Sequence, residues 1–243
     1  MNRIDKMTRL CAMLMASLVL LFPLTADETI TRADGVEIIT LGRKTAINEM
    51  AVYPKGGIAN RPLLMMAHGN GGSGPKEIEG WLELAKKHNF TIVCPTFVSG
   101  QHSIHLPEDV PYFADCLTWL KANLQYNKNQ AFMTGFSGGG YAVWYLGTTR
   151  PDFFQGLFLQ SGNFAGQSYE IDLAPWRDRP IHLIWGTQDS PTVMAQNKEA
   201  VALAKSEHLT QFSIEIIPGA RHQPHHDLVV AWMEQLVSPS GSR

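Results

Sequence analysis

The sequence predicts a single α/β domain built on a twisted, mostly parallel sheet of about eight strands flanked by helices. At 243 residues the chain can bury one continuous core, but it is short for two domains of ordinary size. Short apolar runs recur along it, as expected of strands that are covered on both faces. Stretches with helical periodicity separate these runs, which is the pattern of right-handed βαβ units.

Each element of this prediction comes from a local pattern. Residues 36–41 and 46–53 are two extended segments on either side of Gly42-Arg43-Lys44, and we expect a meander at one sheet edge. The six apolar runs that predict parallel strands are residues 63–67, 90–94, 131–134, 156–159, 181–185 and 212–217. Apolar residues at helical spacing predict helices around Ile78, Trp81, Leu82 and Ala85; Phe113, Cys116, Leu117, Leu120 and Leu124; Val201 and Ala204; and Leu228, Val229, Trp232, Met233 and Leu236.

The first 26 residues differ in composition from the rest of the chain. Arg3, Lys6 and Arg9 precede an apolar stretch at residues 10–24, which ends in Leu24-Thr25-Ala26. This pattern predicts a signal peptide over residues 1–26 and a secreted or periplasmic domain over residues 27–243. A retained anchor is the alternative. The stretch is shorter than the roughly 20 apolar residues of a membrane span, so we expect no stable membrane anchor after cleavage.

The charge balance argues against a nucleic acid partner, and the cysteine content leaves open whether a disulfide forms. The 20 Lys and Arg residues nearly balance 22 Asp and Glu residues, and no basic run could neutralise phosphates, so we expect no nucleic acid partner. Export would leave Cys94 and Cys116 in a compartment where disulfides persist. The two residues either form a disulfide or are small buried hydrophobic residues, because sequence does not fix their separation.

The segment Gly135-Phe136-Ser137-Gly138-Gly139-Gly140 stands between a predicted strand and a predicted helix. Strand, G-x-S-x-G turn and helix together are typical of a nucleophile elbow, in which small neighbours allow a strained serine backbone. Ser137 would also stand at a helix N-terminus, where developing negative charge is stabilised. The alternative is a glycine-rich turn that contacts no substrate.

A serine hydroxyl needs a base to take its proton and a carboxylate to orient that base. Asp189 follows the predicted strand at residues 181–185, and His222 follows the one at residues 212–217. The order Ser137, Asp189, His222 is the order expected when all three lie at the carboxyl ends of parallel strands of this fold. Asp189 could instead cap the helix that begins near Pro191.

Several other residues compete for these roles. Asp172 and Asp178 are weaker candidates for the orienting acid. The spacing of His222, His225 and His226 also permits a metal site, but apart from Asp227 no nearby Cys or carboxylate completes a ligand set. We therefore expect neither a metal nor a cofactor.

A glycine-rich loop, His68-Gly69-Asn70-Gly71-Gly72-Ser73-Gly74, follows the predicted strand at residues 63–67. We expect the backbone N–H groups of Gly138 and Asn70 to form an oxyanion hole, with His68 as a structural hydrogen-bonding residue beneath the loop. A phosphate-binding loop is the alternative, but the Gly-Lys-Ser/Thr ending of such loops is absent. Candidate substrate contacts come from the elbow and from the loops at residues 96–107 and 163–176, and they are Phe136, Phe97, His102, Phe164 and Trp176.

These motifs together resemble the α/β-hydrolase superfamily over residues 36–237. Residues 68–74 with residues 135–140 look most similar to dienelactone hydrolases and polyhydroxybutyrate-depolymerase-like esterases. A dienelactone hydrolase would carry a cysteine at the position of Ser137, so the serine favours an esterase or depolymerase. Only residues 161–179 separate two predicted strands where relatives insert a lid, so we expect no lid domain.

The resemblance implies a serine esterase that hydrolyses a small or polymeric carboxylic ester through an acyl-enzyme. A peptidase or perhydrolase with the same triad remains an alternative, because these reactions share the same residues. A non-catalytic binding protein that keeps the fold is another.

Overall fold

The computed structural model describes residues 26–42, 48–98, 106–162 and 171–237. Nine strands among them form one mixed sheet in the order β1-β2-β3-β5-β4-β6-β7-β8-β9. The strands are β1 (Ala26–Thr31), β2 (Glu37–Leu41), β3 (Glu49–Tyr53), β4 (Leu63–Ala67), β5 (Thr91–Pro95), β6 (Ala131–Phe136), β7 (Gly156–Gln160), β8 (Ile181–Gly186) and β9 (Phe212–Ile217). Neighbouring strands from β5 to β9 pair in parallel, whereas β1, β2 and β3 pair antiparallel and join the sheet through β5. The predicted α/β fold with a mostly parallel sheet is confirmed.

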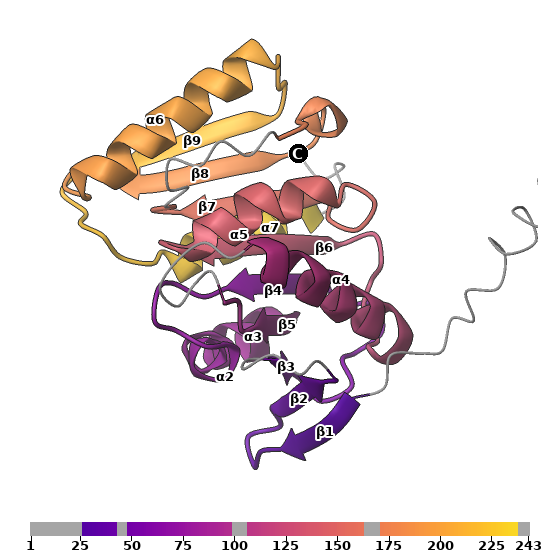
Figure 1. Cartoon of the computed structure of the whole chain (residues 1–243). Helices are drawn as coiled ribbons and strands as arrows, with labels where there is room; N and C mark the ends of the chain where they lie inside the picture. Colours follow the sequence, from indigo (N-terminus) through magenta and orange to yellow (C-terminus); the bar gives the residue numbers. More distant parts are fainter. Residues whose placement is uncertain (1–25, 43–47, 99–105, 163–170, 238–243) are drawn as a thin grey trace, which may run out of the picture.

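Helices cover both faces of the sheet (Figure 1). One face packs against α4 (Leu106–Asn123), α5 (Gly139–Tyr145) and α6 (Pro191–Ser206). The other packs against α3 (Leu82–His88) and α7 (His226–Val237), together with the short 3-10 helix η1 (Ile78–Trp81). Shorter helices complete the described chain: α2 (Gly74–Glu77), η2 (Gly147–Thr149) and η3 (Ala174–Trp176). The central strands are buried on both sides, which explains why they are apolar along most of their length.

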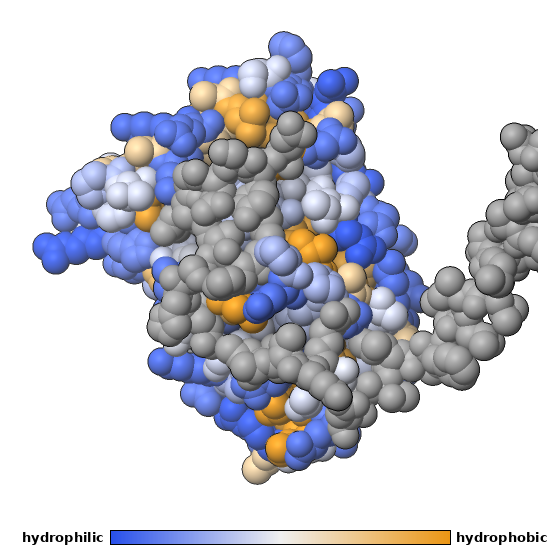
Figure 2. Space-filling model, viewed as in Figure 1, coloured by the Kyte–Doolittle hydropathy of each residue, from blue (hydrophilic) through white to orange (hydrophobic). Residues whose placement is uncertain are grey.

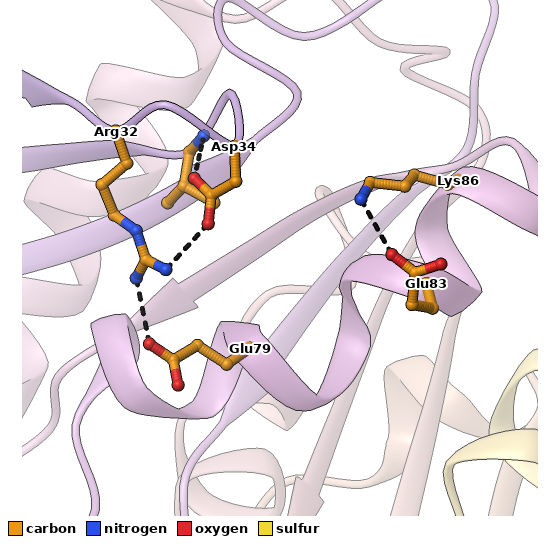
Figure 3. Close-up of polar contacts among 6 residues, drawn as sticks. Arg32, Asp34, Glu79, Glu83 and Lys86 are labelled. Carbon is orange, nitrogen blue, oxygen red and sulfur yellow. Dashed lines mark hydrogen bonds and ion pairs between the residues drawn. The ribbon is translucent and has the colours of Figure 1, made fainter.

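The strand β1 is the element that the sequence pattern missed. It pairs with β2 at the sheet edge, and Ile30 on it is exposed, so no apolar alternation marks it. The turn after it is fixed by Arg32, which contacts Asp34 at 2.7 Å and Glu79 of η1 at 3.1 Å (Figure 3). Asp34 also accepts a hydrogen bond from the backbone N–H of Val36. These exposed pairs fix the position of the turn more than they add stability.

The two cysteines lie on opposite faces of the sheet. Cys94 on β5 belongs to the core beneath α3 and α7, and Cys116 on α4 belongs to the core on the other side. The structure contains no disulfide between them, so the possible pairing is corrected to two buried thiols. Burial raises the pKa of the Cys94 thiol well above its usual value, because the anion would lose its hydration.

The surface is mostly polar on the side that carries α4, α5 and α6, and its apolar residues form small separate patches (Figure 2). Ile214 and Ile216 are among the more exposed apolar side chains, and both lie on the edge strand β9. No helix within the described ranges is long and apolar enough to cross a membrane.

The first residue of α7, His226, makes the stability of the fold depend on pH. Its ring stacks on Trp81 with a centroid separation of 4.1 Å, and burial lowers its pKa to about 4. The unfolded chain, with a histidine pKa near 6.5, therefore takes up the proton first as the pH falls. The buried neutral ring therefore contributes on the order of 3 kcal/mol to the free energy of unfolding. This contribution is complete above pH 6.5 and is lost as the pH falls from about 6.5 to 4.

His226→Phe keeps a stacking ring but cannot be protonated. We expect this variant to lose less of its free energy of unfolding than wild type between pH 6.5 and 4. Urea unfolding between pH 4 and 8 measures it. The same change at the exposed His208 is the control for the effect of replacing a histidine with phenylalanine. Burial also lowers the pKa values of His68 and His182, so some slope will remain. An unchanged slope in His226→Phe would contradict the assignment.

Candidate active site

The turn between β6 and α5 holds Ser137 in a left-handed backbone conformation, with φ of 53°. A non-glycine residue in this region is uncommon and strained, and such residues cluster at functional sites. Hydrogen bonds on both sides hold the turn: the N–H of Ser137 donates to the carbonyl of Gln160 at 3.0 Å, and that of Gly140 donates to the carbonyl of Ser137 at 2.9 Å. The turn therefore has the geometry of a nucleophile elbow.

The glycines around Ser137 are required by close packing. A Cβ on Gly135 would lie 2.3 Å from the carbonyl oxygen of Gly139. A Cβ on Gly139 would lie 2.0 Å from the carbonyl oxygen of Ala67 on β4. Any side chain at either position would push the turn away from itself or from the neighbouring strand.

Three side chains from three strand ends form one hydrogen-bonded chain. The Nε2 atom of His222 lies 2.8 Å from Oγ of Ser137, and its Nδ1 atom lies 2.8 Å from Oδ1 of Asp189. The Asp189 side chain is fully buried, whereas the His222 side chain is 37% exposed. With Nδ1–H donating to the carboxylate, Nε2 keeps a lone pair that can accept the serine proton.

Asp189 does not cap the following helix. Ser190 is the N-cap of α6, and its hydroxyl accepts a hydrogen bond from the N–H of Val193 at 3.2 Å. Asp189 instead accepts the N–H of Ser190 at 2.7 Å through the same Oδ1 atom that contacts His222. One oxygen of the carboxylate is thus fixed by the backbone and directed at the imidazole.

The competing acids have other partners. Asp172 accepts a hydrogen bond from the N–H of Ala174, at the start of η3. Asp178 accepts one from the hydroxyl of Thr210. Of the three candidate acids, Asp189 is the one that contacts His222.

The other histidines near His222 are engaged through different groups. The backbone N–H of His225 donates to the side chain of Gln160 at 2.7 Å, and the ring of His226 stacks on Trp81. Within the described ranges, no three His, Cys, Asp or Glu side chains converge in an arrangement that could hold a metal ion. His222 alone of the three contacts Ser137.

The loop after β4 lies directly against the elbow. A Cβ on Gly69 would lie 3.6 Å from Cβ of Ser137, and a Cβ on Gly138 would lie 3.2 Å from the backbone nitrogen of Asn70. Among the described residues, neither the N–H of Asn70 nor that of Gly138 has a recorded hydrogen-bond acceptor. Both donors are therefore available to an oxygen bound beside Ser137.

His68 holds this loop from below. The N–H of Phe97 donates to Nε2 of His68 at 2.9 Å, so the ring proton is on Nδ1, which donates to the carbonyl of Gly69 at 2.8 Å. The residue is buried, and this burial lowers the pKa of the imidazole. A neutral His68 thus connects β4 to the chain after β5, as expected of a structural residue.

Replacing Gly138 with alanine tests the oxyanion hole. The new Cβ would lie 2.1 Å from Oδ1 of Asn70, so that side chain must move, and 3.2 Å from the backbone nitrogen of Asn70, the other proposed donor. We expect kcat for an ester to fall by about 10²- to 10³-fold, the usual effect of losing one such donor. The thermal unfolding midpoint serves as the control, because a comparable loss of stability would point to damage to the fold instead. A kcat within a few fold of wild type would contradict the assignment.

The residues predicted to contact substrate differ in their burial. Phe136 is half-buried, and its ring packs on that of His222 at 4.9 Å between centroids. Phe97 and Trp176 are buried, which corrects the expectation that they offer edges to a substrate. Phe97 packs on Tyr112 and Phe113, and the indole N–H of Trp176 donates to the carbonyl of Thr148. His102 and Phe164 lie outside the described residues.

Two site residues escaped sequence reasoning. Ser190 is the helix cap, a place for which the sequence offered Asp189 only as an alternative to its role as the orienting acid. Gln160 was overlooked although it is a polar residue at the end of a strand that is otherwise apolar. A polar residue in an apolar strand indicates a buried amide, and a buried amide needs hydrogen-bond partners.

The sheet topology, the elbow after β6 and the positions of Ser137, Asp189 and His222 after β6, β8 and β9 define the α/β-hydrolase fold. No family model matches the chain. A curated relative is poly(3-hydroxyalkanoate) depolymerase C of Paucimonas lemoignei, 28% identical over 116 residues, which are 42% of this chain and 28% of the relative. The chain thus matches little more than a quarter of that protein's length.

Solved structures show the same fold over most of the chain. Acetyl xylan esterase from Aspergillus awamori has a TM-score of 0.63 and 17% identity, covering 82% of this chain and 98% of its own. The fluorophosphonate-binding serine hydrolase F of Staphylococcus aureus has a TM-score of 0.59 and 13% identity, covering 87% and 97%. At these identities the comparison establishes the α/β-hydrolase fold.

Proposed function

We propose that this chain is a carboxylic ester hydrolase that works through a covalent acyl-enzyme, with Ser137 as nucleophile. The observation that carries this proposal is the continuous chain of hydrogen bonds from buried Asp189 through His222 to Ser137, with 2.8 Å at each step. A nucleophile, a base within hydrogen-bond reach and a third group that orients the base are the arrangement that activates a serine.

We propose a role for each group in the reaction. Nε2 of His222 takes the proton as Oγ of Ser137 attacks the ester carbonyl, and Asp189 stabilises the imidazolium that forms. The N–H groups of Gly138 and Asn70 donate to the resulting oxyanion. His222 then gives its proton to the leaving alcohol. A water molecule then attacks the acyl-enzyme while His222 takes its proton, and His222 passes that proton to Oγ of Ser137 as the acyl–oxygen bond breaks and the carboxylic acid leaves.

The named similarities favour an ester over the alternatives. Acetyl xylan esterase, esterase PE8 and a feruloyl esterase module share the fold, and the curated relative is a polyester depolymerase. We therefore propose a small or polymeric carboxylic ester as substrate. A peptidase or perhydrolase would use the same residues and remains the second candidate. A purely binding protein would have no need for the proton-accepting geometry of His222.

We also propose export, followed by removal of residues 1–26. The N-terminal composition supports this, because Arg3, Lys6 and Arg9 precede an apolar stretch at residues 10–24 that ends in Leu24-Thr25-Ala26. The mature domain would span residues 27–243. N-terminal sequencing of protein recovered from the culture fluid or periplasm should read from Asp27, and an uncleaved chain in the membrane fraction would contradict the proposal.

The function is tested by hydrolysis of p-nitrophenyl esters of increasing acyl length, beside the matching anilide and with or without a chelator. We expect turnover of at least the short esters, little turnover of the anilide and no effect of the chelator. Preference for the anilide would favour a peptidase, and loss of activity with the chelator would favour a metal-dependent reaction. No turnover of any ester would contradict the proposal.

A further inference from the structure

Gln160, the last residue of β7, is fully buried beside the elbow. It lies opposite Phe136 in the β6–β7 register, and its backbone carbonyl accepts the N–H of Ser137 at 3.0 Å. Its side-chain Nε2 donates to the hydroxyl of Thr134 at 3.0 Å, and its Oε1 accepts the N–H of His225 at 2.7 Å. One residue therefore contacts both the nucleophile turn and the loop that carries the base.

The orientation of this amide follows from its partners. A backbone N–H can only donate, so the atom that faces His225 must be the oxygen, and the NH₂ group then faces Thr134. The side chain is excluded from solvent, so water cannot replace these partners. Gln160 thus forms a fixed bridge from the strand β6 to the start of α7.

Apart from Gln160, the loop at residues 218–225 is anchored near its start, where the N–H of Gly219 donates to the hydroxyl of Thr187 at 2.8 Å. At one end the N–H of Gln188 donates to the carbonyl of Ala220 at 2.9 Å. At the other end the N–H of His225 donates to Gln160. Within the described chain, no backbone hydrogen bond is recorded for residues 221–224, and the His222 side chain between the two anchors is 37% exposed. These two ends therefore hold the backbone that carries His222, while Asp189 and Phe136 contact its ring directly.

We propose that Gln160 is a positioning residue that fixes the distance between Oγ of Ser137 and Nε2 of His222. Its backbone holds the serine, its side chain holds the histidine loop, and it touches neither substrate nor reacting atoms. The inference rests on the proposed function for its kinetic consequence. Its structural consequence, a fixed His222, stands apart from that function.

The test compares Gln160→Met with Thr134→Val. Methionine has a similar length but offers no acceptor for the N–H of His225. Valine at position 134 disturbs the same buried amide but leaves the bond to His225 in place. We expect Gln160→Met to lower kcat for an ester by about 10²-fold, as a misplaced catalytic group does, with KM within about twofold. Thr134→Val should keep kcat within about threefold, although both variants unfold at a lower temperature.

A third variant, Gln160→Glu, is the rescue. Glutamate keeps an oxygen toward His225 and can accept the hydroxyl of Thr134, so we expect it to recover most of the lost kcat at pH values where it folds. It also keeps the test decisive if the methionine variant unfolds. Equal losses of kcat in Thr134→Val and Gln160→Met would reduce Gln160 to a packing role and overturn the proposal.

A readout independent of catalysis is the proton NMR signal of the His222 Nδ1–H, which is shifted strongly downfield by its bond to Asp189. We expect it to be sharp in wild type and in Thr134→Val and to broaden or vanish in Gln160→Met. If wild type hydrolyses no ester, the proposed function fails, yet this signal still decides whether Gln160 positions His222. A sharp signal and near-normal kcat in folded Gln160→Met would overturn the inference.

Discussion

Replacing Ser137 with alanine is expected to lower kcat for a p-nitrophenyl ester by about 10⁶-fold, the usual effect of removing the nucleophile of a triad. The change removes the one atom that attacks the carbonyl, while the elbow and its glycine contacts remain. The residual rate would come from the oxyanion donors and from substrate binding. Stopped assays with purified protein, corrected for spontaneous hydrolysis, measure it.

The chain offers a matched control at Ser161. This serine is also buried, follows the neighbouring strand β7 and has a positive φ, 45°. We expect Ser161→Ala to keep kcat within a few fold, because its hydroxyl does not contact His222. If Ser137→Ala retained more than about a hundredth of the activity, the nucleophile would have to be another residue.

The second large effect is expected for Asp189→Asn, with a loss of about 10⁴-fold in kcat/KM. The amide nearly preserves the shape of the carboxylate but lacks the charge that stabilises the His222 imidazolium. It can also hold the imidazole in the wrong tautomer, in which Nε2 carries a proton and cannot accept one from Ser137. Both effects act on the chemical step, so KM should change little.

Asp172→Asn and Asp178→Asn are the controls for this loss. Both carboxylates are exposed and bonded to other groups, so we expect their removal to leave kcat/KM within about twofold. Measurement between pH 6 and 9 shows whether the deficit of Asp189→Asn persists throughout. A loss below tenfold would mean that another group orients His222.

The parallel strands could be predicted because a buried strand is apolar along its whole length, and the helices between them keep a 3.6-residue period. The order Ser137, Asp189, His222 could be predicted because each residue directly follows a strand, and the carboxyl ends of parallel strands meet at one edge. The edge strand β1 could not, because residues 28–31 of it are all exposed, so burial imposes no apolar alternation on them.

Contacts that depend on the direction of a side chain could not be read from the sequence. An aromatic residue in a loop can turn outward or into the core, and Trp176 turns inward to Thr148. Cys94 and Cys116 both read as buried, but nothing in the pattern placed them on opposite faces of the sheet. The link from Gln160 to His225 joins residues 65 positions apart and required the structure.

The most direct test of the central claim is intact-mass analysis after treatment with a fluorophosphonate, followed by peptide mapping. We expect wild type to gain one phosphonyl group on the peptide that contains Ser137, Ser137→Ala to gain none, and Ser161→Ala to react as wild type does. Modification of a different residue, or no reaction of correctly folded wild type, would contradict the assignment of Ser137 as an activated nucleophile.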